Sequence, residues 1–305
     1  MKIGLIDVDG HHYPNLALMH ISAYHKQRGD SVDWWNALER YDRVYMSKVF
    51  TWTPDIDTVI MADEICKGGT GYGIYDSLPD EIEHIFPDYS IYPFATAAYG
   101  FITRGCIRKC PWCVVPKKEG EIRPNERWQD IKRPDSRDMI LMDNNVLALS
   151  YGIEQIEEMS HADVRIDFNQ ALDARLVTPE IAKMLANCKW LTRIRFACDT
   201  PQMLPVVERV MGLLNENGVN SRKVMIYAMF SDIEEAEKRH KALQKLGVDI
   251  YMPPFRPFDG SEPSAEVKRF ARWANRPAIW RQCSYSDYRK EVQNGLVEGN
   301  DLQTL

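Results

Sequence analysis

The stretch 100-GFITRGCIRKCPWCVVP-116 holds three of the seven cysteines of the chain. Three residues separate Cys106 from Cys110, and two separate Cys110 from Cys113. Thiolates are the usual ligands of iron–sulfur clusters, and short spacings allow one loop to surround one cluster. A cubane cluster held entirely by protein needs four thiolates, and no fourth cysteine follows at short range. The stretch therefore predicts a cluster with one open iron, where chemistry can take place.

Two other uses of these cysteines have to be weighed. Cys110 and Cys113 form a C-x-x-C pair, which is also typical of zinc sites. A structural zinc site needs a second ligand pair of similar spacing, and Cys188 and Cys198 do not form one. A disulfide is disfavoured because the chain otherwise has the character of a cytosolic protein, where disulfides are rare. We favour the cluster and keep zinc as the alternative.

The pattern Cys106-x-x-x-Cys110-x-x-Cys113, with Trp112 before the last cysteine, resembles the signature of the radical S-adenosylmethionine (SAM) superfamily. The preceding Arg104-Gly105 resembles the branch with a cobalamin-type domain in front of the barrel, and the methylthiotransferases. The resemblance implies that the three cysteines bind a [4Fe–4S] cluster and that SAM, beside Trp112, chelates the fourth iron. Reduction would then cleave SAM to a 5′-deoxyadenosyl radical, which abstracts hydrogen from an unidentified substrate. It also implies an electron donor such as flavodoxin or ferredoxin.

Composition limits the class of protein. The chain has 305 residues with 45% hydrophobic and 27% charged residues, which is ordinary for a globular protein of one large or two modest domains. The net charge of −6 argues against an extended nucleic-acid surface. No apolar run is long enough to cross a membrane, no signal-peptide pattern opens the chain, and the remaining cysteines are scattered. We expect a cytoplasmic protein with no membrane partner.

Residues 1–94 are predicted to form a small Rossmann-like domain, with strands at 3–8, 32–35, 43–46 and 58–61 and a helix at 14–28. It resembles a cobalamin-binding domain, but it lacks the Asp-x-His-x-x-Gly loop of that domain, and Asp9-Gly-His-His12 does not replace it. We therefore regard it as degenerate and do not expect cobalamin. The glycine-rich stretch 68–73 lacks the Lys-[Ser/Thr] of a phosphate-binding P-loop, so a flexible loop is expected.

Residues 95–260 alternate between apolar strand patterns and helical patterns. Such alternation predicts β/α units. The count of six strands matches the partial (β/α)6 TIM-type barrel that the resemblance implies. The overall class is α/β. The predicted strands are 93–100, 139–142, 164–168, 193–197, 223–230 and 248–252, and the predicted helices are 153–159, 178–188, 204–217 and 233–246.

Polar residues follow several of these strands. Asp143-Asn144-Asn145 could accept hydrogen bonds from an ammonium group, and by resemblance they hold the amino group of SAM; the same residues could simply cap a helix. The resemblance makes Asp173 and Arg175 candidates for contacts with SAM or substrate, although a surface ion pair is equally simple.

Asp199 ends the fourth strand of the predicted barrel. Its place at a strand end would let it meet the ribose or ammonium of SAM. With the three cysteines, Trp112 and the polar residues after the second and third strands, it completes the predicted cofactor site.

Residues 261–305 are predicted to be an extension rich in arginine and tryptophan. These side chains could stack on a base or a peptide, or the extension could pack on the barrel. The substrate stays open between a nucleoside, a peptide and a small metabolite, as does the choice between an oxidoreductase and a transferase. The alternatives in function are a cobalamin-dependent radical SAM methyltransferase and a non-catalytic iron–sulfur protein.

Overall fold

The computed structural model describes residues 1–293, which form two compact units. The first contains Met1–Gln170, Asn187–Leu191 and Pro257–Ser261, and the second contains Ala171–Ala186, Thr192–Arg256 and the described residues from 262 on. Residues 94 and 95 both lie inside the first unit, so no break between the units falls where the front domain was predicted to end. The division into 1–94, 95–260 and 261–305 stays a prediction.

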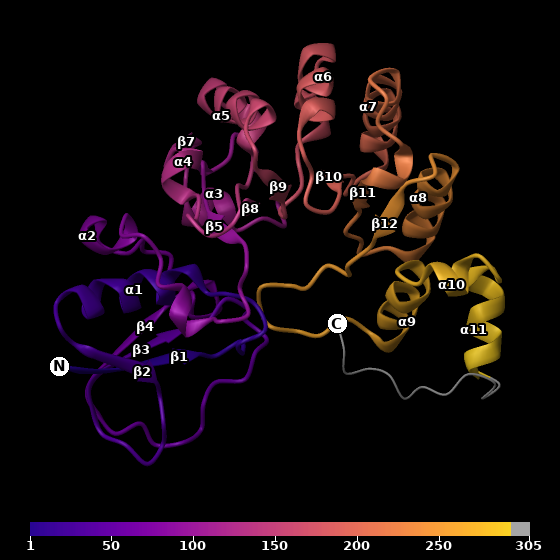
Figure 1. Ribbon diagram of the computed structural model, residues 1–305. Helices are drawn as coiled ribbons and strands as arrows, with labels where there is room; N and C mark the ends of the chain where they lie inside the picture. The colour runs from indigo at the N-terminus through magenta and orange to yellow at the C-terminus, as the bar shows by residue number, and fades with distance from the viewer. Residues whose placement is uncertain (294–305) are drawn as a thin grey trace. The chain divides into compact units, whose positions relative to one another are not determined.

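The front of the first unit is a parallel four-stranded sheet in the order β2-β1-β3-β4. Its strands are β1 (Lys2–Asp7), β2 (Ser31–Trp34), β3 (Tyr41–Ser47) and β4 (Ala62–Gly68). Helix α1 (Leu16–Gln27) lies along one face of this sheet (Figure 1). Asn15 caps this helix by accepting from the Leu18 amide, and Gly29 ends it with a φ of +81°. The front region is therefore a parallel α/β layer, and its Rossmann-like character stays a prediction.

The fourth strand was predicted wrongly. The apolar residues at 58–61 suggested a strand, whereas β4 begins at Ala62 and has a largely exposed, charged sequence. This strand is at the edge of the sheet, so only one of its sides is paired, and its side chains do not need the alternation of a half-buried strand. Arg43 of β3 pairs with Glu64 of β4 across the ladder.

The same unit contains a parallel three-stranded sheet in the order β5-β8-β9. These strands are β5 (Ala98–Gly100), β8 (Asp138–Leu141) and β9 (Arg165–Phe168). Strand β5 is followed by β6 (Thr103–Arg104), which pairs antiparallel with β7 (Arg123–Pro124). Strand β8 is followed by helix α5 (Ser150–His161). Short helices complete the unit: α2 (Asp80–Glu83), α3 (Val115–Lys118) and α4 (Trp128–Ile131).

The second unit is built on a parallel sheet in the order β10-β11-β12, with strands Ile194–Ala197, Val224–Tyr227 and Asp249–Tyr251. Helices α6 (Pro179–Asn187), α7 (Leu204–Glu216) and α8 (Ile233–Lys245) lie on one side of these strands (Figure 1). Right-handed crossovers between parallel strands place successive helices on the same face. The predicted strands and helices of this region are confirmed within a few residues.

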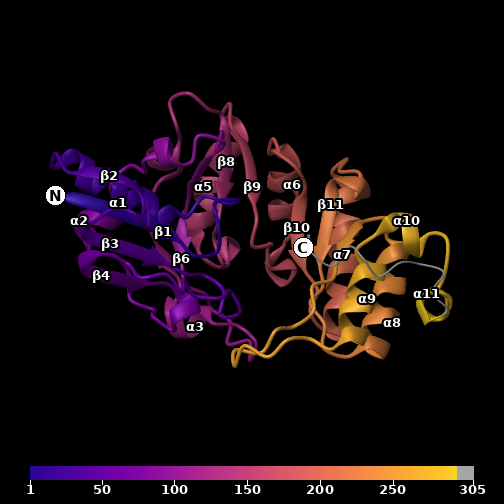
Figure 2. The same cartoon turned by 90° about the horizontal axis from the view of Figure 1, so that it is seen from below.

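The C-terminal extension forms α9 (Ala265–Ala274), α10 (Pro277–Trp280) and α11 (Tyr285–Gln293), visible in Figure 2. Phe270 and Trp273 are buried, and the indole of Trp273 lies against the ring of His240 on α8 and donates to the carbonyl of Cys283. Trp273 is therefore a packing residue rather than a stacking surface for a ligand. The part of the predicted extension at 294–305 lies outside the described residues.

The six strands predicted for the barrel are all present, as two parallel sheets of three strands, one in each unit. The structure thus confirms a mixed α/β protein with parallel sheets. None of the helices among residues 1–293 is long and apolar enough to cross a membrane.

Candidate metal-binding cysteine loop

The cysteine loop, residues 105–122, follows the carboxyl end of β5. The paired segments on either side of it, 103–104 and 123–124, form what we call the neck of the loop. Strands β6 and β7 pair there, and the amide of Asn125 donates to the carbonyl of Ile102 at 2.8 Å. The side-chain amide of Asn125 donates to the carbonyl of Phe101 at 3.0 Å. The backbone of Cys106 is held in the same way, because its N–H donates to the carbonyl of Gly120 at 3.2 Å. The two ends of the loop are therefore held together by hydrogen bonds of the chain itself.

Gly105 allows the close approach of the two sides of this neck. Its φ is +84°, and a Cβ atom there would lie 2.3 Å from the carbonyl oxygen of Glu121. Any side chain would push the two strands of the neck apart. The glycine before the first cysteine thus has a local structural reason, separate from any cofactor.

Glu119 is the buried acceptor at the centre of the loop, with a side chain only 6% exposed. Its Oε2 accepts from the amide of Gly105 and from the side-chain amide of Asn144, both at 2.9 Å. The guanidinium of Arg104, itself 13% exposed, lies 3.4 Å away. The carboxylate therefore joins the start of the loop, its end and the polar residues after β8.

None of the three cysteines forms a disulfide, and all three are partly exposed. The amide of Arg108 donates to Sγ of Cys106 at 3.3 Å, and the side-chain amide of Asn145 donates to the same sulfur at 3.4 Å. The amide of Cys113 donates to the carbonyl of Cys110 at 3.0 Å, which turns the backbone between the last two cysteines. Burial raises the pKa of the Cys113 thiol, and the nearby Cys110 and Cys106 raise it further.

Among residues 1–293, no three His, Cys, Asp or Glu side chains are gathered closely enough to hold a metal ion. The cysteines nevertheless fit an iron–sulfur cluster in kind: they lie on one loop, none forms a disulfide, and a side-chain amide donates to one of them. The predicted cluster ligands Cys106, Cys110 and Cys113 are thus together on one anchored segment.

Asp143 follows β8 and is 2% exposed. One carboxylate oxygen accepts from the hydroxyl of Thr103 at 2.7 Å and from its amide at 2.5 Å, and the other accepts from the amide of Ile102 at 3.2 Å. Burial raises the pKa of Asp143 to about 6, although these hydrogen bonds lower it in part. The residue predicted to bind the SAM ammonium therefore fixes the start of the cysteine loop on the end of β8.

Asn144 and Asn145 extend the same connection. Asn144 donates to Glu119, and Asn145, 3% exposed, donates to the sulfur of Cys106. Neither side chain caps the following helix, because α5 begins at Ser150 and has no side-chain cap. Trp112 lies between the last two cysteines and is partly buried. The structure thus brings these predicted cofactor residues together around one loop.

The other predicted cofactor residues, Asp173, Arg175 and Asp199, belong to the second unit. Nε of Arg175 donates to Asp173 at 2.7 Å and Nη2 donates at 3.0 Å, so these two residues form a bidentate pair. Asp199 accepts from the amide of Met229 at 2.9 Å, and burial raises its pKa.

Arg239 on α8 was not identified from the sequence, because it is one of many charged residues on an amphipathic helix. It is 1% exposed and donates to the carbonyls of Cys198 and Met229, which follow β10 and β11. It also pairs with Glu235. Glu119 was missed for a similar reason, since it stands in the ordinary charged run 117-KKEGE-121. No spacing in the sequence distinguishes either residue.

Comparison with known proteins adds little to this geometry. No family model matches the chain, and no curated protein matches it. Among solved structures, one similar chain is the C-terminus of E. coli RcsC, which contains a linker region and a phosphoreceiver domain. The two chains are 10% identical over 97% of this chain and 95% of that chain, with a TM-score of 0.21. A TM-score this low carries no argument about fold or function.

Proposed function

We propose that this protein is a radical SAM enzyme whose cluster is held by Cys106, Cys110 and Cys113. The observation that carries the proposal is the arrangement of these three cysteines, none of them in a disulfide, on one loop. The loop leaves the carboxyl end of a parallel strand and is closed by its own backbone pairing. The carboxyl ends of strands are where β/α proteins place their chemistry. The spacing of the cysteines and the aromatic residue before the last one support the same assignment.

The bound cluster and SAM would supply a 5′-deoxyadenosyl radical that takes hydrogen from a substrate. The residues of the chain would provide binding and orientation. The donation from Asn145 to Cys106 would orient the sulfur and reduce its negative charge. Asp143 would hold the start of the loop, and Asn144 and Glu119 would hold its end. The proposed SAM contacts of Trp112, Asp173, Arg175 and Asp199 rest on the resemblance.

We also propose that β5, β8, β9, β10, β11 and β12 are the strands of one partial (β/α)6 barrel. Their support is the chain order, the parallel pairing inside each sheet, and the helices α5, α6, α7 and α8 that follow β8, β9, β10 and β11. The front sheet would then be an added domain without a cobalamin role.

The test is anaerobic reconstitution with iron and sulfide, followed by addition of SAM and a strong reductant. We expect a cluster signal in electron paramagnetic resonance and formation of 5′-deoxyadenosine. Both should be lost in Cys106→Ala, Cys110→Ala and Cys113→Ala. Cys66→Ala is the matched control, because Cys66 is a partly exposed cysteine on β4, away from the loop in sequence. It should behave like the unaltered protein.

The other results separate the alternatives. A stable cluster that never cleaves SAM, with any substrate class supplied, would indicate a non-catalytic cluster protein. Retained zinc and no iron would contradict the cluster assignment. Stoichiometric retention of cobalamin would favour the methyltransferase and would contradict our view of the front sheet.

A further inference from the structure

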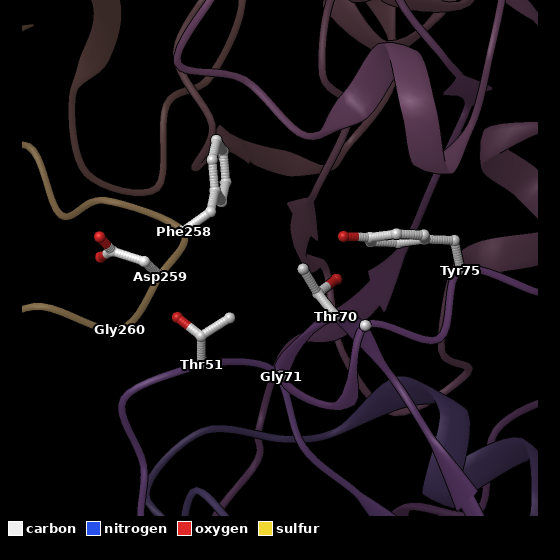
Figure 3. Close-up of a pocket in the computed structure, with 8 residues that line it drawn as sticks. Thr51, Thr70, Gly71, Tyr75, Phe258, Asp259 and Gly260 are labelled. Carbon is white, nitrogen blue, oxygen red and sulfur yellow. The ribbon is translucent and has the colours of Figure 1, made fainter.

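A pocket of about 310 Å³ lies at the carboxyl edge of the front sheet. It is lined by Thr51 from the loop after β3, by Thr70, Gly71, Gly73 and Tyr75 from the loop after β4, and by residues 258–260 (Figure 3). All of these residues belong to the first unit. Because β3 and β4 are parallel, their carboxyl ends meet at one edge, which is where open α/β sheets bind ligands.

The glycine-rich loop of this pocket is not built to hold a phosphate. Its successive amides from 71 to 74 all donate to backbone carbonyls of residues 48, 69 and 70. Gly71 is required by the packing of the two loops, since a Cβ atom there would lie 2.8 Å from the carbonyl oxygen of Phe50. A phosphate cradle needs amides that point at the ligand, and these amides are already used.

The charge of the lining leads to the same conclusion. Asp259 is the only charged residue among those that line the pocket in the described part of the chain. Its pKa is lowered, mainly by the amide of Ser261, so it is ionised at neutral pH. An anionic ligand would meet this carboxylate, and the lining residues themselves include no cation. The ammonium of Lys117 lies nearby, over the ring of Tyr75.

What the pocket does offer is two aromatic rings and three hydroxyl groups. Figure 3 shows the Tyr75 hydroxyl directed toward the region between Thr70 and Phe258. Phe258 is 53% exposed, so its ring is accessible. An aromatic ring suits the flat face of a base or sugar, while hydroxyl groups bind hydroxyls and amides. The volume is at the lower end for ligand pockets, which run from about 300 to 1,000 Å³.

The pocket is connected to the cysteine loop by one contact. Nζ of Lys117, in α3 of that loop, lies 4.6 Å from the centre of the Tyr75 ring. A cation over an aromatic face is attracted by the ring, so the loop and the pocket wall are held together. A ligand in the pocket would therefore lie beside the proposed cluster-binding segment.

We propose that this pocket binds a neutral nucleoside, with the base against Phe258 and the ribose hydroxyls on the hydroxyl groups of the wall. That the nucleoside is the substrate of the radical reaction rests on the proposed function. Its binding does not, because the pocket contains neither a cysteine nor any of the residues assigned to SAM.

The test is calorimetric titration of the purified full chain, without reductant or SAM, against the four ribonucleosides, their 5′-monophosphates and ribose. A ligand of this size should bind with a Kd of about 0.1 mM. We expect at least one nucleoside to bind, with its monophosphate about fivefold or more weaker because of Asp259. Asp259→Asn should reduce that difference, and ribose alone should bind much more weakly.

Two variants locate the binding. Phe258→Ala should weaken nucleoside binding about tenfold, as expected for loss of one stacking ring, and Thr70→Val should weaken it severalfold. Phe94→Ala is the matched control, because Phe94 is 52% exposed and does not line the pocket. No saturable binding up to the solubility limit, tighter binding of the monophosphate, or nucleoside binding unchanged in Phe258→Ala would each overturn the proposal. The production of 5′-deoxyadenosine is a separate measurement, so either proposal can fail alone.

Discussion

Replacing Glu119 is the sharpest test of how the cysteine loop is held. The carboxylate accepts from the Gly105 amide and the Asn144 side chain, and it faces the guanidinium of Arg104. Breaking a buried ion pair by removing one partner costs about 3 to 5 kcal/mol. The contact with Arg104 is long, at 3.4 Å, and Arg104 keeps 13% of its side chain exposed, so part of that cost is relieved by water.

For Glu119→Ala we therefore expect a loss of about 2 to 4 kcal/mol in the free energy of unfolding. Glu119→Gln keeps an acceptor for Gly105 but loses the charge, and should cost about 1 to 2 kcal/mol. A domain with about 5 to 15 kcal/mol of stability would stay folded in both cases. Both variants should also retain less iron after reconstitution and desalting, in the same order.

The assay is urea unfolding followed by tryptophan fluorescence, with iron content measured on the same preparations. Glu121→Gln is the control, because Glu121 is an exposed glutamate on the same segment and should change neither quantity. If Glu119→Ala unfolds at the same urea concentration as the control, the carboxylate does not hold the loop, and the reasoning is wrong.

Three further substitutions test other parts of the structure. Gly105→Ala should lower the free energy of unfolding by about 2 kcal/mol or more and lower the iron content, because the new Cβ atom would lie 2.3 Å from a backbone oxygen. Gly73→Ala, with a φ of +69° and open space around the new Cβ atom, should lower the free energy of unfolding by only about 1 kcal/mol. Burial raises the pKa of Asp7 to about 6, so the contribution of Asp7 to stability falls as pH rises from about 4 to about 6. The free energy of unfolding of Asp7→Asn, relative to that of the unaltered protein, should therefore rise by about 2 kcal/mol over this pH range. A difference between the two proteins that does not change with pH would refute the assignment. Arg239→Met should destabilise the protein by about 2 to 4 kcal/mol in urea unfolding, since two buried carbonyls lose their donor; an unchanged midpoint would show that they find other partners.

Much of the secondary structure follows from the sequence. The repeated strand and helix patterns between residues 139 and 252 predict their elements closely, because each strand has buried apolar residues at its core positions and the helices between them are amphipathic. The fourth strand of the front sheet was misplaced because an edge strand lacks that signal. The hairpin of β6 and β7 was missed because each strand has only two residues and its pairing depends on the Gly105 conformation.

The site shows a similar limit. Cysteine spacing identifies the three thiols, and the position after β8 identifies Asp143 to Asn145. Their partners cannot be predicted in this way. Glu119 becomes important only because the chain returns to Gly105, and Asp143 turns its carboxylate to Thr103 through tertiary structure. Local charge patterns carry no information about such contacts.

Under the proposed function, the closed neck of the cysteine loop would separate folding of the loop from loading of the cluster. In small zinc domains, binding of the ion supplies the folding free energy, so chelators unfold them. Here the hydrogen bonds from Cys106 to Gly120 and from Asn125 to Ile102 form from the chain alone. If the proposed cluster is bound, we expect the chain to accept it after folding rather than to fold around it. Damage to the cofactor by oxygen would then be repaired by refilling rather than by new synthesis.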